Sequence, residues 1–149
     1  MIENIWFVDD DLDDCELFKT VINSVLPSAA ITYIHNGEVF MDSLKFTDQP
    51  DMIFLDINMP CKNGLDCLSE IRSYTQYSNL PIIIFSSSAE PKQISAAYEK
   101  GANLYFTKPS SYKEMETGIA TILRMDWNEP LQIKKKHKVN ESFVPFKVS

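Results

Sequence analysis

Apolar and polar positions alternate between two periods along the first 125 residues of the chain. Short runs of β-branched and aromatic residues indicate strands, and apolar residues three or four positions apart indicate amphipathic helices. The predicted strands cover residues 4–8, 30–34, 52–55, 82–85 and 104–106. A predicted helix follows each strand; the helices cover 12–25, a short stretch around 39–44, the face of Leu65, Leu68 and Ile71, 91–100 and 112–125.

Turn and cap residues separate these elements. Pro27 ends the first helix, and Pro91 suits the first turn of the fourth helix. Asn36-Gly37 predicts a turn, and Lys100-Gly101 is a typical helix stop. Asp11 directly precedes the first helix and is a typical N-cap. The boundaries of the elements are therefore marked independently of the hydrophobic pattern.

The order of the elements predicts the fold class. Met52–Leu55 is a continuous apolar run, as expected of a strand that is buried on both faces of a parallel sheet. Five strand–helix units predict an α/β, doubly wound, five-stranded parallel sheet with five helices and right-handed crossovers. A length of 149 residues suits one domain. We expect residues 1–125 to form this domain and 126–149 to form a C-terminal tail, with no output domain.

Composition and charge narrow the class of protein. The net charge is −7; residues 1–125 hold 9 Lys/Arg against 18 Asp/Glu, and residues 126–149 hold 5 against 3. An acidic body argues against nucleic-acid binding, and no apolar run approaches the length of a membrane span. The three cysteines form no CxxC pair, and their odd number without a signal peptide points to the reducing cytoplasm. We expect each of them to pack as a small apolar residue.

The candidate chemistry lies just after four of the predicted strands. Asp9-Asp10-Asp11 follows the first strand, Asp56 the third, Ser86 the fourth and Lys108 the fifth. In an open α/β sheet the ligand crevice lies outside the carboxyl ends of the strands. One pocket could therefore combine carboxylates, a hydroxyl and an ammonium group, which suits a divalent cation together with a phosphoryl group.

The acidic residues are assigned by charge. Clustered carboxylates repel one another unless a cation is present, so we expect Asp9 and Asp10 to hold Mg²⁺, which prefers oxygen ligands. Asp56 either caps the loop that follows it or is a nucleophile that accepts a phosphoryl group. Asn58 would lie beside the metal. Asp13 and Asp14 are expected to be solvated residues in the first turn of the helix.

Ser86 and Lys108 carry little information when each is considered alone. A serine after a strand is often a cap, and a single lysine is usually a solvated surface charge. Pro109 holds the backbone of Lys108 extended. Only the combination of these residues with the acidic cluster favours roles in phosphoryl binding.

The combined pattern closely resembles the receiver domain of two-component response regulators, including the stand-alone chemotaxis receiver. The resemblance covers residues 2 to about 125. Its matching stretches are 7–11, 51–60 running on to 63–65, 80–86, 101–102 and 105–109. The resemblance implies a flavodoxin-like strand order of 2-1-3-4-5. It also implies a protein that is not an enzyme apart from self-catalysed phosphorylation and dephosphorylation.

The resemblance also implies a role for each residue of the pocket. By position, Asp9 and Asp10 match the pair that holds Mg²⁺, and Asp56 matches the phosphoacceptor. Asn58 matches the residue whose backbone carbonyl completes the metal site. The three remaining matches are Ser86 and Lys108, which bind the phosphoryl group, and Tyr105, whose rotamer reports phosphorylation.

The resemblance further implies a cis peptide bond at Lys108-Pro109. It implies that the phosphoryl donor is a histidine kinase or a phosphotransfer protein. The fourth helix, fifth strand and fifth helix would form the face that binds a downstream protein, which the sequence does not name.

Three other readings stay open at this point. A phosphorelay intermediate would need the same pocket and would differ only in its partner. An aspartyl-phosphate hydrolase of the haloacid dehalogenase type usually has a second Asp where this chain has Asn58, and usually adds a cap domain. A flavodoxin-like carrier shares the topology, but the acidic residues after the first strand would repel FMN.

The tail differs in composition from the body. It contains a basic cluster, Lys134–Lys138, and an apolar end, Phe143–Val148. Its apolar residues are too many for a typical disordered tail. We expect the tail to pack on its own body or on a second protomer of a homodimer, with the basic cluster against the acidic body. A disordered extension and nucleic-acid binding are the alternatives.

Overall fold

A computed structural model of the protein describes residues 2–139 and 142–148. Five parallel strands form one sheet in the order β2-β1-β3-β4-β5, which confirms the predicted fold class and order. The strands are β1 (Asn4–Val8), β2 (Ala30–Ile34), β3 (Met52–Leu55), β4 (Ile82–Ser86) and β5 (Leu104–Thr107). β2 and β5 are therefore the two edges of the sheet.

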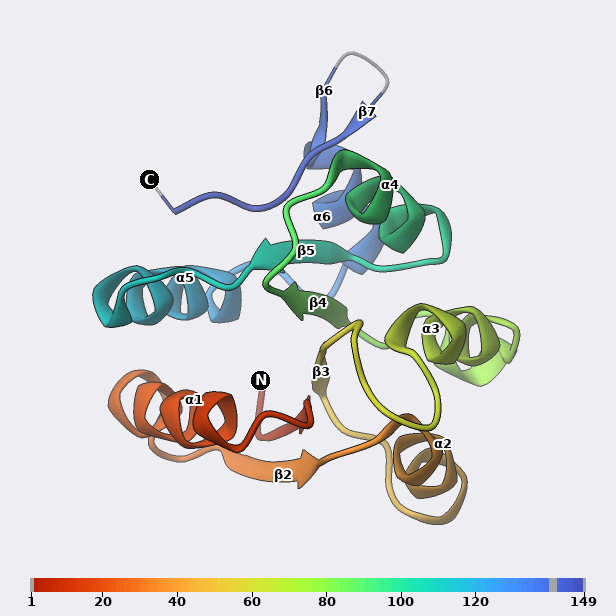
Figure 1. Ribbon diagram of the computed structural model, residues 1–149, viewed down its shortest axis with the longest axis horizontal. Helices are drawn as coiled ribbons and strands as arrows, with labels where there is room; N and C mark the ends of the chain where they lie inside the picture. Colours follow the sequence, from red (N-terminus) through yellow and green to blue (C-terminus); the bar gives the residue numbers. More distant parts are fainter. Residues whose placement is uncertain (1, 140–141, 149) are drawn as a thin grey trace.

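Helices cover both faces of the sheet, so the fold has three layers (Figure 1). The helices that follow the strands are α1 (Leu12–Val25), α2 (Gly37–Phe46), α3 (Gly64–Arg72), α4 (Pro91–Glu99) and α5 (Tyr112–Leu123). α1 and α5 pack on one face, and α2, α3 and α4 pack on the other. The carboxyl ends of the strands are thereby left open between the loops.

The core consists of two hydrophobic clusters separated by the sheet. Residues of β3 point to them alternately: Ile53 and Leu55 join the cluster under α2–α4, and Met52 and Phe54 join the cluster under α1 and α5. All four residues are buried. A strand with apolar contacts on both faces needs an uninterrupted apolar run, which explains the pattern in the sequence.

Most helix boundaries follow the predicted cap residues. The Asp11 carboxylate accepts hydrogen bonds from the backbone N–H groups of Asp13 and Asp14, as an N-cap does. The predicted turn at Asn36-Gly37 is instead the start of α2, because Asn36 is its N-cap and Gly37 its first residue. Gly101 has φ +112°, a left-handed conformation that ends α4 as expected.

The structure adds elements that the hydrophobic pattern does not predict. They are a 3₁₀ helix, η1 (Thr75–Tyr77), a sixth α-helix, α6 (Pro130–Lys136), and an antiparallel pair, β6 (Lys138–Val139) with β7 (Ser142–Phe143). The prediction of five helices is therefore too low for the described residues. The added elements are short, and a short element lacks a period that a sequence pattern can reveal.

The tail packs on the body of its own chain, which is the first of the two predicted arrangements. Ile133 and Phe146 are buried in the cluster under α1 and α5. The predicted position of the basic cluster against the acidic body involves no ion pair: within residues 2–139 and 142–148, no tail lysine is paired with an acidic residue of the body. Lys134 instead donates a 2.6 Å hydrogen bond to the carbonyl of Tyr98 in the last turn of α4. The partial negative charge at a helix C-terminus favours such a cation.

The cysteines are all free, and only two of them match the prediction. Cys15 and Cys67 are buried, whereas Cys61 is exposed. Cys61 lies in the loop between β3 and α3 and has φ 70°. The loop leaves it in solvent, so the prediction of an apolar filler is wrong there. Among the described residues, no helix has the length and apolar character needed to cross a bilayer.

Candidate functional site

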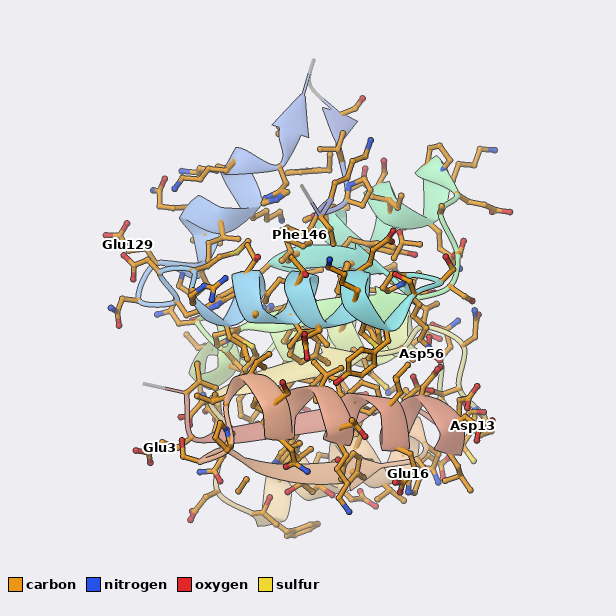
Figure 2. The ribbon with its side chains drawn as sticks, turned by 90° about the vertical axis from the view of Figure 1, so that its left-hand side faces the viewer. Glu3, Asp13, Glu16, Asp56, Glu129 and Phe146 are labelled. Atoms are coloured by element: carbon orange, nitrogen blue, oxygen red, sulfur yellow. The ribbon has the colours of Figure 1, made fainter. Side chains whose placement is uncertain are left out.

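The predicted site lies at the carboxyl ends of the strands. Asp9 follows β1, Asp56 follows β3 and Lys108 follows β5, and these strands belong to one sheet. Figure 2 shows Asp56 at the same end of the molecule as Asp13, which belongs to the first turn of α1. The topology therefore brings together residues that are far apart in the sequence.

Three carboxylates form the acidic part of the site. Asp9, Asp10 and Asp56 each offer an oxygen atom, and these atoms lie within 4.8 Å of one another. Asp9 and Asp56 are buried, at 1% and 7% exposure, and Asp10 is exposed. The structure thus confirms that the two predicted metal ligands and the predicted phosphoacceptor meet.

The acidic part of the site fits Mg²⁺. One oxygen of Asp9, Oδ1, accepts a 3.0 Å hydrogen bond from the backbone N–H of Asp11. The other, Oδ2, is buried and has no partner in hydrogen-bonding geometry among the described residues. This buried oxygen, which is paired with the ammonium group of Lys108 at 2.9 Å, and the carboxylate of the exposed Asp10 provide the oxygen donors that a hard divalent cation prefers.

Burial changes the acidity of this cluster. Desolvation raises the pKa of Asp56 to about 7; the charge of Lys108 opposes this effect, and the charge of Asp9 adds to it. The backbone N–H groups of Asn58 and Ile57 also lower the pKa of Asp56. Burial raises the pKa of Asp9 as well, against the hydrogen bond from Asp11. Bound positive charge would favour the ionised form of both groups.

Lys108 is the cation of the site. Its Nζ lies 2.9 Å from Oδ2 of Asp9 and 3.8 Å from Oδ2 of Asp56. It also lies 2.7 Å from Oδ2 of Asp14. Burial lowers the pKa of Lys108, but its close contacts with the carboxylates of Asp14 and Asp9 outweigh burial and raise the pKa overall. The ammonium group is therefore held in its charged form among three carboxylates.

Asp14 corrects one prediction and adds a residue to the site. It was expected to be solvated, yet it is paired with Lys108. A signal for this role exists in the sequence, because Asp14 lies four residues before Phe18. Residues four apart share a helix face, and Phe18 is fully buried on the inward face of α1.

The predicted cis bond at Lys108-Pro109 is wrong. The described residues contain no cis peptide bond, so this bond is trans. The backbone N–H of Lys108 donates a 2.7 Å hydrogen bond to the carbonyl of Ser86. From this position the long lysine side chain reaches the carboxylates with a trans bond.

Ser86 ends β4, and Tyr105 lies in β5, the strand that precedes Lys108. Both are fully buried. The hydroxyl of Ser86 accepts a 3.3 Å hydrogen bond from the backbone N–H of Ser88, and the hydroxyl of Tyr105 donates a 2.8 Å bond to the carbonyl of Ser88. The loop residue Ser88 therefore connects the two, a role that the sequence pattern does not reveal.

Asn58 is placed less specifically. Its side chain is exposed, and its backbone N–H is hydrogen-bonded to Asp56. This position follows the phosphoacceptor as predicted. The role of its backbone carbonyl as a metal ligand stays a prediction.

The sequence matches the profile of the response regulator receiver domain over residues 5–120. The chain therefore belongs to the response regulator receiver domain family of two-component signalling proteins. Proteins of this family are phosphoacceptors rather than classical enzymes, and they act with histidine kinases or phosphotransfer proteins.

Individual relatives agree with this assignment. The chain is 31% identical over 132 residues to the transcriptional regulatory protein CpxR of Escherichia coli (strain K12), covering 88% of this chain and 54% of CpxR. It spans about half or less of the length of the transcriptional regulators it matches.

Two solved structures cover most of the chain. The bacteriophytochrome response regulator RtBRR is 31% identical with a TM-score of 0.71, and the match covers 91% of this chain and 88% of that one. The Mn²⁺-bound form of response regulator Rcp1 is 25% identical with a TM-score of 0.74, covering 80% and 91%.

Proposed function

We propose that this chain is a response regulator receiver that accepts a phosphoryl group on Asp56 and then changes its binding partner. The observation that carries this proposal is the position of Asp56. Its carboxylate is buried, shares an oxygen cluster with Asp9 and Asp10, and has the ammonium group of Lys108 3.8 Å away. Phosphoryl transfer requires a nucleophilic oxygen and positive charge, which Lys108 and a divalent cation held by Asp9 and Asp10 would supply.

The proposed reaction is a transfer from a phosphohistidine of a histidine kinase or phosphotransfer protein. An oxygen of Asp56 attacks the phosphorus, the P–N bond breaks, and a P–O bond to Asp56 forms. Asp9, Asp10, Asp56 and the carbonyl of Asn58 would hold Mg²⁺, which supplies charge that neutralises the phosphoryl oxygens when bound. Lys108 places a second positive charge at the same position, and its release from Asp14 would free it for the phosphoryl group.

Ser86 and Tyr105 are proposed to report the reaction. A phosphoryl group on Asp56 adds acceptor oxygens beside Ser86. If the hydroxyl of Ser86 turns to this group, its bond from the N–H of Ser88 is lost, and Ser88 also holds the hydroxyl of Tyr105. A local change in charge would in this way alter the loop between β4 and α4, and with it the surface that a downstream protein contacts.

A phosphorelay intermediate is the second candidate function, because the same pocket could return the phosphoryl group to another histidine. A hydrolase is less well supported, since Asn58 lacks the carboxylate that would serve as acid and base. We place either function in the cytoplasm, where free cysteines such as buried Cys15 and Cys67 stay reduced.

The test of this proposal is phosphorylation with acetyl phosphate and MgCl₂, followed by intact mass spectrometry. The wild-type chain should gain one phosphoryl group, and Asp56→Asn should gain none. Asp66→Asn is the matched control, because Asp66 is exposed on α3 and should leave labelling unchanged. Efficient labelling of Asp56→Asn would contradict the assignment. Incubation of the labelled chain with unphosphorylated phosphotransfer proteins separates the two candidates, since only an intermediate passes the group on.

A further inference from the structure

The edge of the sheet at β5 is covered by the chain's own tail. An edge strand presents unpaired backbone N–H and C=O groups. At Tyr105 both groups are taken: its carbonyl accepts a 2.7 Å hydrogen bond from the N–H of Phe146, and its N–H donates a 3.0 Å bond to the hydroxyl of Tyr98. Phe146 also forms an isolated parallel bridge with Phe106. The tail thus meets the edge strand through one backbone hydrogen bond and one isolated bridge residue.

Two aromatic side chains hold this segment in place. The ring of Phe143 stacks on Tyr98 of α4, with 4.8 Å between the ring centroids and 20° between the planes. The ring of Phe146 meets Phe106 of β5 edge-on, at 5.4 Å and 84°. The hydroxyl of Tyr98 donates a 3.0 Å hydrogen bond to the carbonyl of Val144, between the two rings. The edge therefore recognises an extended backbone with aromatic residues three positions apart.

The helix on the other side of the edge leaves room for the end of the segment. A Cβ atom at Gly118 of α5 would lie 2.4 Å from the ring of Phe106 and 3.1 Å from the side chain of Val148. Only a residue without a side chain fits this contact. Figure 1 shows the tail passing α4 and running on beside α5.

The segment is attached less firmly than the core strands. β6 and β7 pair over only two residues each, and an isolated two-stranded hairpin is at best marginally stable. Phe143 is half-buried. A cavity of about 570 Å³ opens between the end of the segment and the loop after β5, lined on one side by Lys108 and Pro109 and on the other by Phe146 and Val148. The tail therefore covers the edge without filling the space next to the phosphoacceptor site.

We propose that the β5 edge, between α4 and α5, is a peptide-binding site that the segment Ser142–Val148 occupies from within its own chain. A partner protein would bind there by supplying an extended segment with two aromatic side chains three positions apart. Addition of a strand to a sheet edge provides affinity through backbone hydrogen bonds and specificity through side-chain pockets. The tail must leave before such a partner can bind.

Tyr105 connects this edge to the site. Its backbone carries the hydrogen bonds to Phe146 and Tyr98, and its side chain carries the bond to Ser88. A change at Ser88 would therefore reach the residue on which the tail depends. That the partner is the downstream protein of a phosphorylation switch rests on the proposed function. Peptide binding at the β5 edge can be tested without phosphorylation.

The test uses a fluorescently labelled synthetic peptide of residues 138–148 and the full-length, unphosphorylated chain. Peptide affinity is measured by fluorescence anisotropy. In the wild-type chain the tethered segment competes at an effective concentration of the order of mM, so the peptide should bind weakly. The Phe143→Ala/Phe146→Ala variant should bind it about tenfold more tightly or better, because its own segment is weakened.

Phe46→Ala is the matched control, because Phe46 is 82% exposed on α2 and should leave the affinity at the wild-type value. A peptide in which both phenylalanines are alanine should not bind the opened variant. Equal affinities for the wild-type chain and the double variant, or no binding to a double variant that circular dichroism shows to be folded, overturn the proposal. If the double variant does not fold, Phe143→Ala decides: tighter binding than wild type supports the proposal, and wild-type affinity overturns it.

The two proposals fail independently. If the expected peptide binding is absent but Asp56 is labelled normally, the peptide-binding proposal is wrong and the phosphoacceptor proposal stands. If the chain binds the peptide but acetyl phosphate does not label it, the phosphoacceptor proposal is wrong and the peptide-binding proposal stands.

Discussion

The crevice at the carboxyl ends of the strands, which holds Asp9, Asp56 and Lys108, and the β5 edge, which holds the tail, should affect the stability of the fold differently. In the crevice, charged groups are buried with incomplete hydrogen bonding, and the pKa of Asp56 is raised to about 7. At the edge, backbone groups are paired and aromatic rings are stacked. The crevice should therefore reduce the stability of the free protein, whereas the edge should increase it. The crevice keeps Asp56 available for reaction, and the β5 edge holds the tail segment that we propose can leave.

The largest effect on stability should separate the edge from the core. Phe18→Ala, in the core, should lower the free energy of unfolding by about 4 kcal/mol, as for other buried phenylalanines. Phe146 is also buried, at 8% exposure, but its segment can leave the surface. Phe146→Ala should therefore cost only about 2 kcal/mol. Phe46→Ala should change stability by less than about 0.5 kcal/mol. Urea denaturation measures all three, and equal losses for Phe18→Ala and Phe146→Ala would show that the tail is part of the core.

A substitution in the crevice, in contrast, is expected to raise the free energy of unfolding. Folding raises the pKa of Asp56 from 3.8 to about 7, so the folded state binds its proton more tightly than the unfolded state. Stability should then fall as the pH rises through this range, and the loss should be complete above pH 7. Without metal, Asp56→Asn should be more stable than wild type at pH 8 by roughly 1–3 kcal/mol, and less dependent on pH between 4 and 7.

The control for this gain in stability is Asp66→Asn, because Asp66 is exposed. Its thermal melts at pH 5 and pH 8 should match those of the wild type. Addition of MgCl₂ should stabilise the wild-type chain, because a ligand that binds only the folded state raises its stability. A wild-type chain that becomes more stable from pH 5 to pH 8 in EDTA would contradict the assignment of Asp56.

Metal affinity provides a sharper view of the crevice. Removal of Asp10 takes away one of three clustered carboxylates. Asp10→Ala should weaken Mg²⁺ binding by at least the 10–100-fold, or roughly 1.4–2.8 kcal/mol, that is typical even of outer-shell partners. Isothermal titration with MgCl₂ measures the change. Asp13→Ala, three residues further along in the first turn of α1, serves as the control, and an equal loss in both variants would point to general electrostatics instead of ligation.

The smallest effect is expected for the pair between Asp14 and Lys108. Both side chains are partly exposed, at 27% and 16%, and partly exposed ion pairs contribute little to stability. Asp14→Asn should lower the free energy of unfolding by less than about 1 kcal/mol. It should leave phosphorylation in place, whereas Lys108→Met should reduce it. A complete loss of labelling in Asp14→Asn would make Asp14 part of the reaction instead of a holder of the lysine.

The sequence predicts the central sheet well because each strand there is buried. β1, α1, β2 and β3 have the predicted bounds, and β4 and β5 extend one residue further. Asp9, Asp56 and Lys108 could be found because each follows a predicted strand and because their combination is more specific than any one of them. Asp14 was missed because it lies on a helix whose first turn is acidic anyway.

The tail could be predicted only in part, for a physical reason. Its composition indicated packing, but α6 lies in a lysine-rich run that reads as a charge cluster, and β7 is two residues long. Such elements are stabilised by the surface on which they lie and not by their own periodicity. The trans bond before Pro109 was mispredicted because a family resemblance, and no property of these residues, supported the cis form.

The space left by Gly118 has an evolutionary consequence. One added methyl group in α5 would press on the ring of Phe106 and on Val148, and should loosen the contact between the tail and β5 with no change in the sequence of either. A Gly-to-Ala change needs a single nucleotide substitution. Selection could therefore convert a covered regulator into a permanently open one, and back, in one mutational step.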